Sequence, residues 1–265
     1  MAAALRRRIG EEHFGLDGRL RDAARALLPE AAAWLAPGER SGGDGLRVPW
    51  SPRALLLNSF AAWRRDPEAL RLAGITGFRR LAFDVRCPTG VRGTPPMVGL
   101  LASGPAGVVG VVASGIEAYA RRPRALAPSY RHMAETGRPR GWAEVVTTGR
   151  FRHVDCGMLY RVALALRFTF PDRDCRVLYL HLEPADAEGL EPCHDHRREL
   201  GRLETALSGV EVGFAHASFN TLWRAWARTA HPLFAAGLAD RLLARYAVRV
   251  VDRPAPPLAE RGGAP

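Results

Sequence analysis

Short apolar runs separated by glycine and proline dominate the middle of the chain. Residues 78–86, 98–103 and 108–114 form three such runs, and the third is rich in valine. A Pro/Gly-rich connection separates the first two runs, and Gly104-Pro105-Ala106-Gly107 separates the second from the third. Because β-branched residues favour strands and Gly and Pro mark turns, the pattern predicts three consecutive strands.

Strand-like and helix-like segments alternate over the rest of the chain. Helices are predicted over 16–28, 55–65, 153–168, 190–207, 219–229 and 232–246, and further strands over 176–182, 210–218 and 248–251. Pro29 is expected to end the first helix or to begin a new one. The chain is therefore expected to hold an α/β domain over 49–252, after a helical arm and linker over 1–48 and before a disordered tail over 253–265.

The segment 97–116 contains no charged residue. A run of about 20 apolar residues is long enough to span a bilayer. This run is rich in Gly, Ala, Val and Ser, and Gly104-Pro105 interrupts it near its middle. The pattern therefore favours a hairpin over a membrane span, and no membrane partner is expected.

The same region carries a set of short motifs. Arg92-Gly93-Thr94-Pro95-Pro96 precedes Val98-Gly99-Leu100-Leu101, and Gly110-Val111-Val112-Ala113-Ser114 follows with Glu117 close behind. This layout resembles the PD-(D/E)XK nuclease superfamily, in its restriction-endonuclease-like branch, whose members read roughly R-G-T-P-P-x-L-D-L-L and G-V-x-G-V-E-S-K. The resemblance implies a restriction-endonuclease-like mixed β-sheet flanked by helices. A buried hairpin that is similar by chance is the alternative.

The residues that would perform nuclease chemistry are replaced. The resemblance implies an Asp on the second strand and a Glu and a Lys on the third, but Gly99, Val112 and Ser114 occupy these positions. Two carboxylates would hold Mg²⁺, which prefers oxygen ligands, and the ion would activate water for attack on phosphate. We therefore expect a catalytically inactive protein without a cofactor, in a DNA-binding or accessory role.

Two polar residues of the predicted helices have structural explanations. Asn58, within the apolar run 55–65, is expected to cap the helix or to make a hydrogen bond in the core. Asp155, at the start of 153–168, is expected to be a capping residue. In relatives a similar helix carries a Gln and a basic residue near the scissile phosphate, and here Met158 replaces the Gln while Arg161 keeps the charge.

Two alternatives to an inactive DNA-binding protein stay open. In the first, the metal site has migrated: Asp84 and Glu117 would together hold Mg²⁺, and Arg161 would steady the phosphate of an active nuclease. In the second, the chain is a scaffold that binds no nucleic acid, and its charge reflects composition alone.

The chain is strongly basic, with a net charge of +11 and a sequence pI near 10.7. Such a charge favours polyanions, and double-stranded DNA is the expected partner. All 38 basic residues are arginine, so the usual catalytic lysine is absent. The candidate DNA contacts are Arg86, Arg92, Arg121, Arg122 and Arg161. A protein partner or a homo-oligomer is also expected for an accessory role.

The cysteines and the N-terminus bear on the compartment. Cys87, Cys156, Cys175 and Cys193 are few and scattered, and the N-terminus has no apolar run typical of a signal peptide. Both features favour a reducing cytoplasm. Cys193 and His196 are one helical turn apart, but zinc needs four ligands and Cys175 is the one obvious third, so a plain helix start is favoured there.

Overall fold

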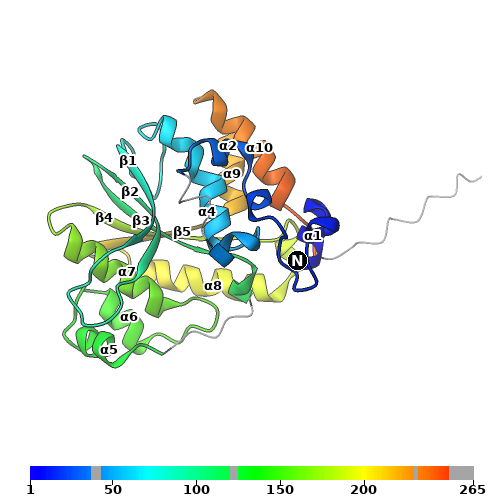
Figure 1. Cartoon of the computed structure of the whole chain (residues 1–265). Helices are drawn as coiled ribbons and strands as arrows, with labels where there is room; N and C mark the ends of the chain where they lie inside the picture. The colour runs from blue at the N-terminus through cyan, green and yellow to red at the C-terminus, as the bar shows by residue number, and fades with distance from the viewer. Residues whose placement is uncertain (37–42, 120–124, 230–231, 251–265) are drawn as a thin grey trace, which may run out of the picture.

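The computed structural model describes residues 1–36, 43–119, 125–229 and 232–250 of the 265-residue chain. One five-stranded mixed sheet lies in the middle, with its strands in the order β1-β2-β3-β4-β5, and helices cover both of its faces (Figure 1). The predicted α/β class, with a mixed sheet between helices, is confirmed.

The sheet joins an antiparallel half to a parallel half. Its strands are β1 Arg80–Arg86, β2 Met97–Gly104, β3 Gly107–Ser114, β4 Cys175–His181 and β5 Val212–Ser218. Strands β1, β2 and β3 pair antiparallel in chain order, while β4 and β5 pair parallel to β3. All five strands match predicted segments, and the uncharged run 97–116 contains the predicted hairpin.

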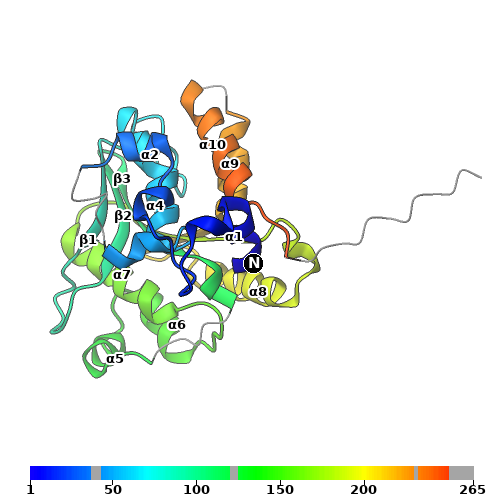
Figure 2. The same cartoon turned by 45° about the vertical axis from the view of Figure 1, so that its right-hand side comes forward.

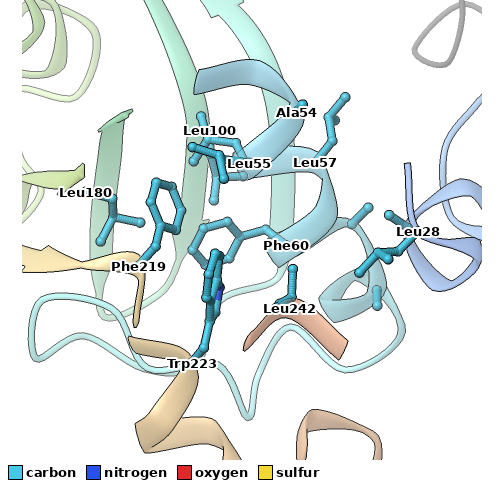
Figure 3. Packing of buried hydrophobic residues seen from close by; sticks show 14 of the residues in the cluster. Leu28, Ala54, Leu55, Leu57, Phe60, Leu100, Leu180, Phe219, Trp223 and Leu242 are labelled. Atoms are coloured by element: carbon cyan, nitrogen blue, oxygen red, sulfur yellow. The ribbon is translucent and has the colours of Figure 1, made fainter. Parts of the chain in front are cut away.

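One face of the sheet is covered by helices from both ends of the chain. These are α1 Ala2–Ile9, α2 Pro29–Ala33, α4 Pro52–Phe60 with η4 Ala61–Arg65, α9 Phe219–Ala227 and α10 Leu233–Tyr246 (Figures 1 and 2). Figure 3 shows the packing at the centre of this layer, where Phe60 and Trp223 lie between Leu242 and the sheet residues Leu100 and Leu180. Aromatic residues of this size contribute much of the buried apolar area.

The other face is covered by helices from the middle of the chain. They are α5 Pro128–Glu135, α6 Trp142–Thr148, α7 Cys156–Thr169 and α8 Glu191–Ala206 (Figure 1). Tyr160, Val162 and Leu166 of α7 pack with Val177 of the sheet and Leu203 of α8 in a second core. Among the described residues, no helix is long and apolar enough to cross a membrane.

The remaining helical turns are short and connect the longer elements. They are η1 Glu11–His13, η2 Ala23–Ala26, η3 Gly43–Arg47, η5 Ile116–Tyr119 and η6 Ala187–Gly189. The helices predicted over 153–168, 190–207, 219–229 and 232–246 are confirmed as α7, α8, α9 and α10. The segment 55–65 is helical as predicted, although it begins earlier, because Ser51 accepts a hydrogen bond from the Ala54 N–H as the N-cap.

The helix predicted over 16–28 is wrong. Phe14 forms an antiparallel bridge with Leu20, and Gly18 between them has a φ of 70°, so the chain turns back on itself there. Of the apolar residues that suggested a helical stripe, Leu20 and Leu27 are buried in the core, whereas Leu16 and Ala24 are exposed. Pro29 begins α2, as predicted.

The predicted last strand is also wrong over the part that the structure describes. Residues 248–250 have no strand partner in the sheet. The Ala185 N–H donates to the Val248 carbonyl over 2.8 Å, and the Val250 N–H donates to the Asp186 carboxylate. These bonds tie the segment to the loop after β4. The tail predicted over 253–265 lies outside the described residues.

Asn58 has the role in the core that its position suggested. It is fully buried, and its side chain accepts from the Leu28 N–H over 2.7 Å. The same amide donates to the Ala26 carbonyl and to the Tyr246 hydroxyl, each over 2.8 Å. One side chain thus links α4 to the N-terminal segment and to α10.

Candidate functional site

The positions that the resemblance assigns to an Asp, a Glu and a Lys lie on the two strands of the hairpin. Leu100 and Val111 form the last pair of this register; beyond it, a Cβ on Gly99 would point toward Leu56 of α4, whereas Val112 packs against the second core on the face of α7. Ser114 ends β3 and pairs with His181 of β4. These positions therefore lie on adjacent strands, but Gly99 and Val112 face opposite sides of the sheet.

Helix α4 closes the space beside Gly99. A Cβ placed on this glycine would lie 2.4 Å from Cδ1 of Leu56, a side chain that is only 2 % exposed. Such an approach is far inside van der Waals contact, so any larger residue at position 99 requires Leu56 to move. The absence of an Asp side chain there is therefore built into the packing of α4 on the sheet.

A cavity of about 360 Å³ lies near the end of β3 on the side of α7. Val112, Glu117, Tyr130, Asp155 and Arg161 are among the residues that line it. Glu117 and Asp155 are the acidic residues of this lining. Val112 presents an apolar surface at the place where the motif would put a carboxylate.

Both acids of this cavity make local hydrogen bonds. Oε1 of Glu117 accepts from the Ser114 hydroxyl over 3.2 Å and from the Gly115 N–H over 2.9 Å. Oδ1 of Asp155 accepts from the Met158 N–H over 2.9 Å and caps α7, as predicted. The two carboxylates therefore stabilise the turn after β3 and the start of α7.

Arg161 reaches across the cavity from α7. Its guanidinium lies 4.8 Å from the centre of the Tyr130 ring and donates to the Thr94 carbonyl over 2.9 Å. Thr94 belongs to the loop between β1 and β2 that carries the Gly-Thr-Pro-Pro motif. The positive charge predicted at this position is thus held beside the cavity by contacts with two other segments.

Asp84 does not line the cavity that contains Glu117 and Arg161. It lies on β1, with β2 between it and β3, and Arg53 of α4 pairs with its carboxylate at 3.0 Å. Its φ is 52°, an uncommon conformation for a residue other than glycine. The structure brings Glu117 and Arg161 to one cavity and places Asp84 elsewhere.

The other predicted arginines differ in position. Arg86 is exposed at the end of β1, and Arg92 is exposed in the loop between β1 and β2. Arg121 and Arg122 lie outside the described residues. Among the residues that the structure describes, no three His, Cys, Asp or Glu side chains are grouped so as to hold a metal ion.

Sequence reasoning missed a buried polar cluster at the carboxyl ends of the parallel strands. Glu183, just after β4, is 5 % exposed, and the Arg197 fork donates to both of its oxygens over 2.8 Å. His181 lies 3.1 Å from the same carboxylate. Burial alone would raise the pKa of Glu183, but hydrogen bonds from Arg197 and His181 lower it to about 2.

His196 of α8 completes this cluster. It is fully buried, its ring centre lies 4.6 Å from that of His181, and its Nε2 is 3.3 Å from the Tyr179 hydroxyl. Burial, followed by the nearby charge of His181, lowers the pKa of His196 to about 3. The signal in the sequence was His181, which ends the apolar run 177–180 of β4.

The Cys-His-Asp-His segment begins α8, as the sequence favoured. Cys193 and His196 are buried on one side of this helix, whereas His194 is exposed. Cys175 lies at the opposite end of β4 from His181, with its thiol near the Leu166 and Phe170 carbonyls. The third zinc ligand considered from the sequence is therefore remote from the other two.

Comparison with known proteins adds no relative, since no family model, no curated protein and no solved structure matches this chain.

Proposed function

We propose that this protein is a catalytically inactive member of the restriction-endonuclease-like group that binds nucleic acid. The observation that carries the proposal is the cavity beside β3. Val112 lines this cavity and supplies no ligand, and the two acids of the lining, Glu117 and Asp155, are engaged in a turn and a helix cap. Arg161 keeps a positive charge at the same place.

The sheet arrangement supports the first half of the proposal. The resemblance implied two adjacent strands bearing the chemical positions and a following helix that faces the phosphate. Strands β2 and β3 pair directly, and α7 packs against β3 and lines the cavity. The polar groups that a nuclease would direct at a metal are the ones that have been replaced.

The charge supports the second half. A net charge of +11 favours phosphate backbones, and arginine forks fit phosphate oxygens. Arg86 and Arg92 are exposed, and neither side chain makes a hydrogen bond or ion pair with another residue that the structure describes. Their guanidinium groups are therefore available to phosphate.

A duplex-binding titration tests the proposal. We expect a labelled 20-bp duplex to bind with an affinity that falls steeply with salt, and the Arg86→Gln/Arg92→Gln variant to reduce the log–log slope by about 1.8, since each phosphate contact contributes about 0.9. The matched control is Arg224→Gln/Arg228→Gln, which removes an exposed arginine of α9 and another directly after it, in the layer of helices on the α4 face of the sheet. An affinity that does not depend on salt would favour the scaffold alternative.

A cleavage assay tests the absence of activity. We expect supercoiled plasmid to stay intact with the purified protein and Mg²⁺ or Mn²⁺. Nicking that is lost in both Asp84→Asn and Glu117→Gln variants would support the migrated metal site and contradict the proposal.

A further inference from the structure

We propose that a second, larger cavity, between α5, the segment 136–140 before α6 and the end of α7, binds an unpaired nucleotide of single-stranded nucleic acid. The inference rests on the proposed nucleic-acid function and names a ligand for a different part of the surface. The cavity has a volume of about 800 Å³, which is within the range of small-molecule sites. Its lining comes from the carboxyl ends of α5 and α7, the segment before α6, and the loop after β1.

An exposed aromatic ring lies at this cavity. Phe168, near the end of α7, lines it and is 56 % exposed, although the rest of the second core is well buried. Gly90 makes room for the ring: a Cβ there would lie 2.7 Å from Cε2 of Phe168, and the φ of Gly90 is 71°. An accessible ring next to cations is the usual platform on which single-stranded nucleic acids stack their bases.

Two arginines share the lining of this cavity with the ring. Arg138 and Arg140 line the cavity and are exposed, and neither guanidinium has a recorded partner among the described residues. Pro139 between them is buried, so the backbone is anchored where the two side chains leave it. Their charges are therefore available for the phosphates on either side of a stacked base.

The acid of this cavity is already neutralised. Glu211 is the acidic residue of the lining, and Arg167 forms an ion pair with it. Arg167 also donates to the Pro171 carbonyl. The remaining field at the cavity is that of Arg138 and Arg140, which suits an anionic ligand with a flat apolar part and excludes a cationic one.

The geometry connects this cavity with the one beside β3. Tyr130 and Arg161 line the smaller cavity, whereas Met133 and Phe168 of the same two helices line the larger one. The hydroxyls of Tyr130 and Thr89 lie 3.3 Å apart and bridge the two linings. Along α7, seven residues span about 10 Å. A single strand laid along α5 and α7 would thus pass both cavities, which a lone mononucleotide would not do.

Fluorescence anisotropy with labelled (dT)12 tests the proposal. We expect Phe168→Ala to weaken binding about tenfold, because stacking on an aromatic side chain is lost, and Phe168→Tyr to stay within about twofold of the wild type. Arg138→Gln/Arg140→Gln should lower the salt slope by about 1.4, since each single-strand phosphate contact contributes about 0.7. The control is again Arg224→Gln/Arg228→Gln, which should change neither quantity.

The outcomes separate this inference from the proposed function. Duplex binding that persists while Phe168→Ala leaves (dT)12 affinity unchanged would overturn the inference alone. Absence of binding to both duplex and (dT)12 would overturn both. If free dTMP displaces labelled (dT)12 as well as unlabelled (dT)12 does at the same nucleotide concentration, the assignment to a single strand is overturned. Tighter binding of a poly-Glu peptide than of (dT)12 would overturn it as well. Because Phe168 and both arginines are exposed, thermal melting should show that these variants fold normally.

Discussion

Acid should destabilise this protein through one buried histidine. His196 has its pKa lowered from 6.5 to about 3 by burial and by the nearby charge of His181. Between these two values the unfolded chain binds a proton that the folded protein does not, so the free energy of unfolding must fall as the pH falls. The stability that this residue contributes is therefore complete above about pH 6.5 and falls progressively between pH 6.5 and about pH 3.

The size of the effect follows from the two pKa values. Integrating the difference in bound protons from pH 7 to pH 5 gives a loss of about 2 kcal/mol for this residue. Between pH 7 and pH 5, Glu183 adds little to the change in stability. Its pKa is about 2 in the folded protein against an ordinary value of 4.5, so its effect on the free energy of unfolding begins only below about pH 5. In stronger acid, the loss of protein stability caused by protonation of Glu183 would add to the loss caused by His196.

The assay is urea unfolding followed by tryptophan fluorescence at pH 7, 6 and 5. We expect His196→Gln to be less stable than the wild type at pH 7, because its contact with the Tyr179 hydroxyl changes. Between pH 7 and pH 5, however, its free energy of unfolding should decrease by about 2 kcal/mol less than that of the wild type. His194→Gln is the matched control: this histidine is exposed on the same helix, so its variant should follow the wild-type profile. A stability difference between wild type and His196→Gln that is the same at all three pH values would refute the reasoning.

Three further substitutions test the packing around the candidate site and the core. Asn58→Ala should cost roughly 3 kcal/mol in urea unfolding, because it leaves buried backbone groups at Leu28 and Ala26 without partners, and a loss below 1 kcal/mol would contradict the hydrogen-bond account. Gly99→Asp should lower stability by about 2 kcal/mol, since its Cβ collides with Leu56, and should restore no Mg²⁺-dependent nicking of plasmid DNA. Asp155→Ala should cost about 1 kcal/mol through loss of the α7 cap, whereas Asp155→Asn should retain most of the stability, and equal losses would argue against capping.

Local patterns were enough to predict most of the regular structure. The valine-rich runs between Gly and Pro turns became β2 and β3, and the apolar segments later in the chain became α7, β4, α9 and α10. Strand and helix periodicity, turn residues and capping residues are properties of neighbouring positions, so they can be read from the order of residues. Helices α5 and α6 were missed within an Arg-, Gly- and Pro-rich stretch, because a few apolar anchors such as Tyr130 and Trp142 stabilise them against the second core.

The sites depend on contacts between distant segments. Glu183, Arg197 and His181 meet because β4 and α8 pack together, and no local pattern ranks these three above other polar residues. The same holds for Arg161, whose contacts come from Thr94 and Tyr130, and for the separation of Asp84 from the cavity of Glu117.

The order of residues alone determined that this chain is an α/β protein with a central hairpin, that it is strongly basic, and that it lacks lysine. It also placed Gly99, Val112 and Ser114 where the proposed resemblance would have an Asp, a Glu and a Lys. Only the tertiary structure decided what surrounds these positions: α4 fills the space beside Gly99, and the nearby acids serve a turn and a cap. The physical reason is that secondary structure follows short-range periodicity, whereas burial, ion pairing and shifted pKa values arise from segments that are far apart in the chain and meet only on folding.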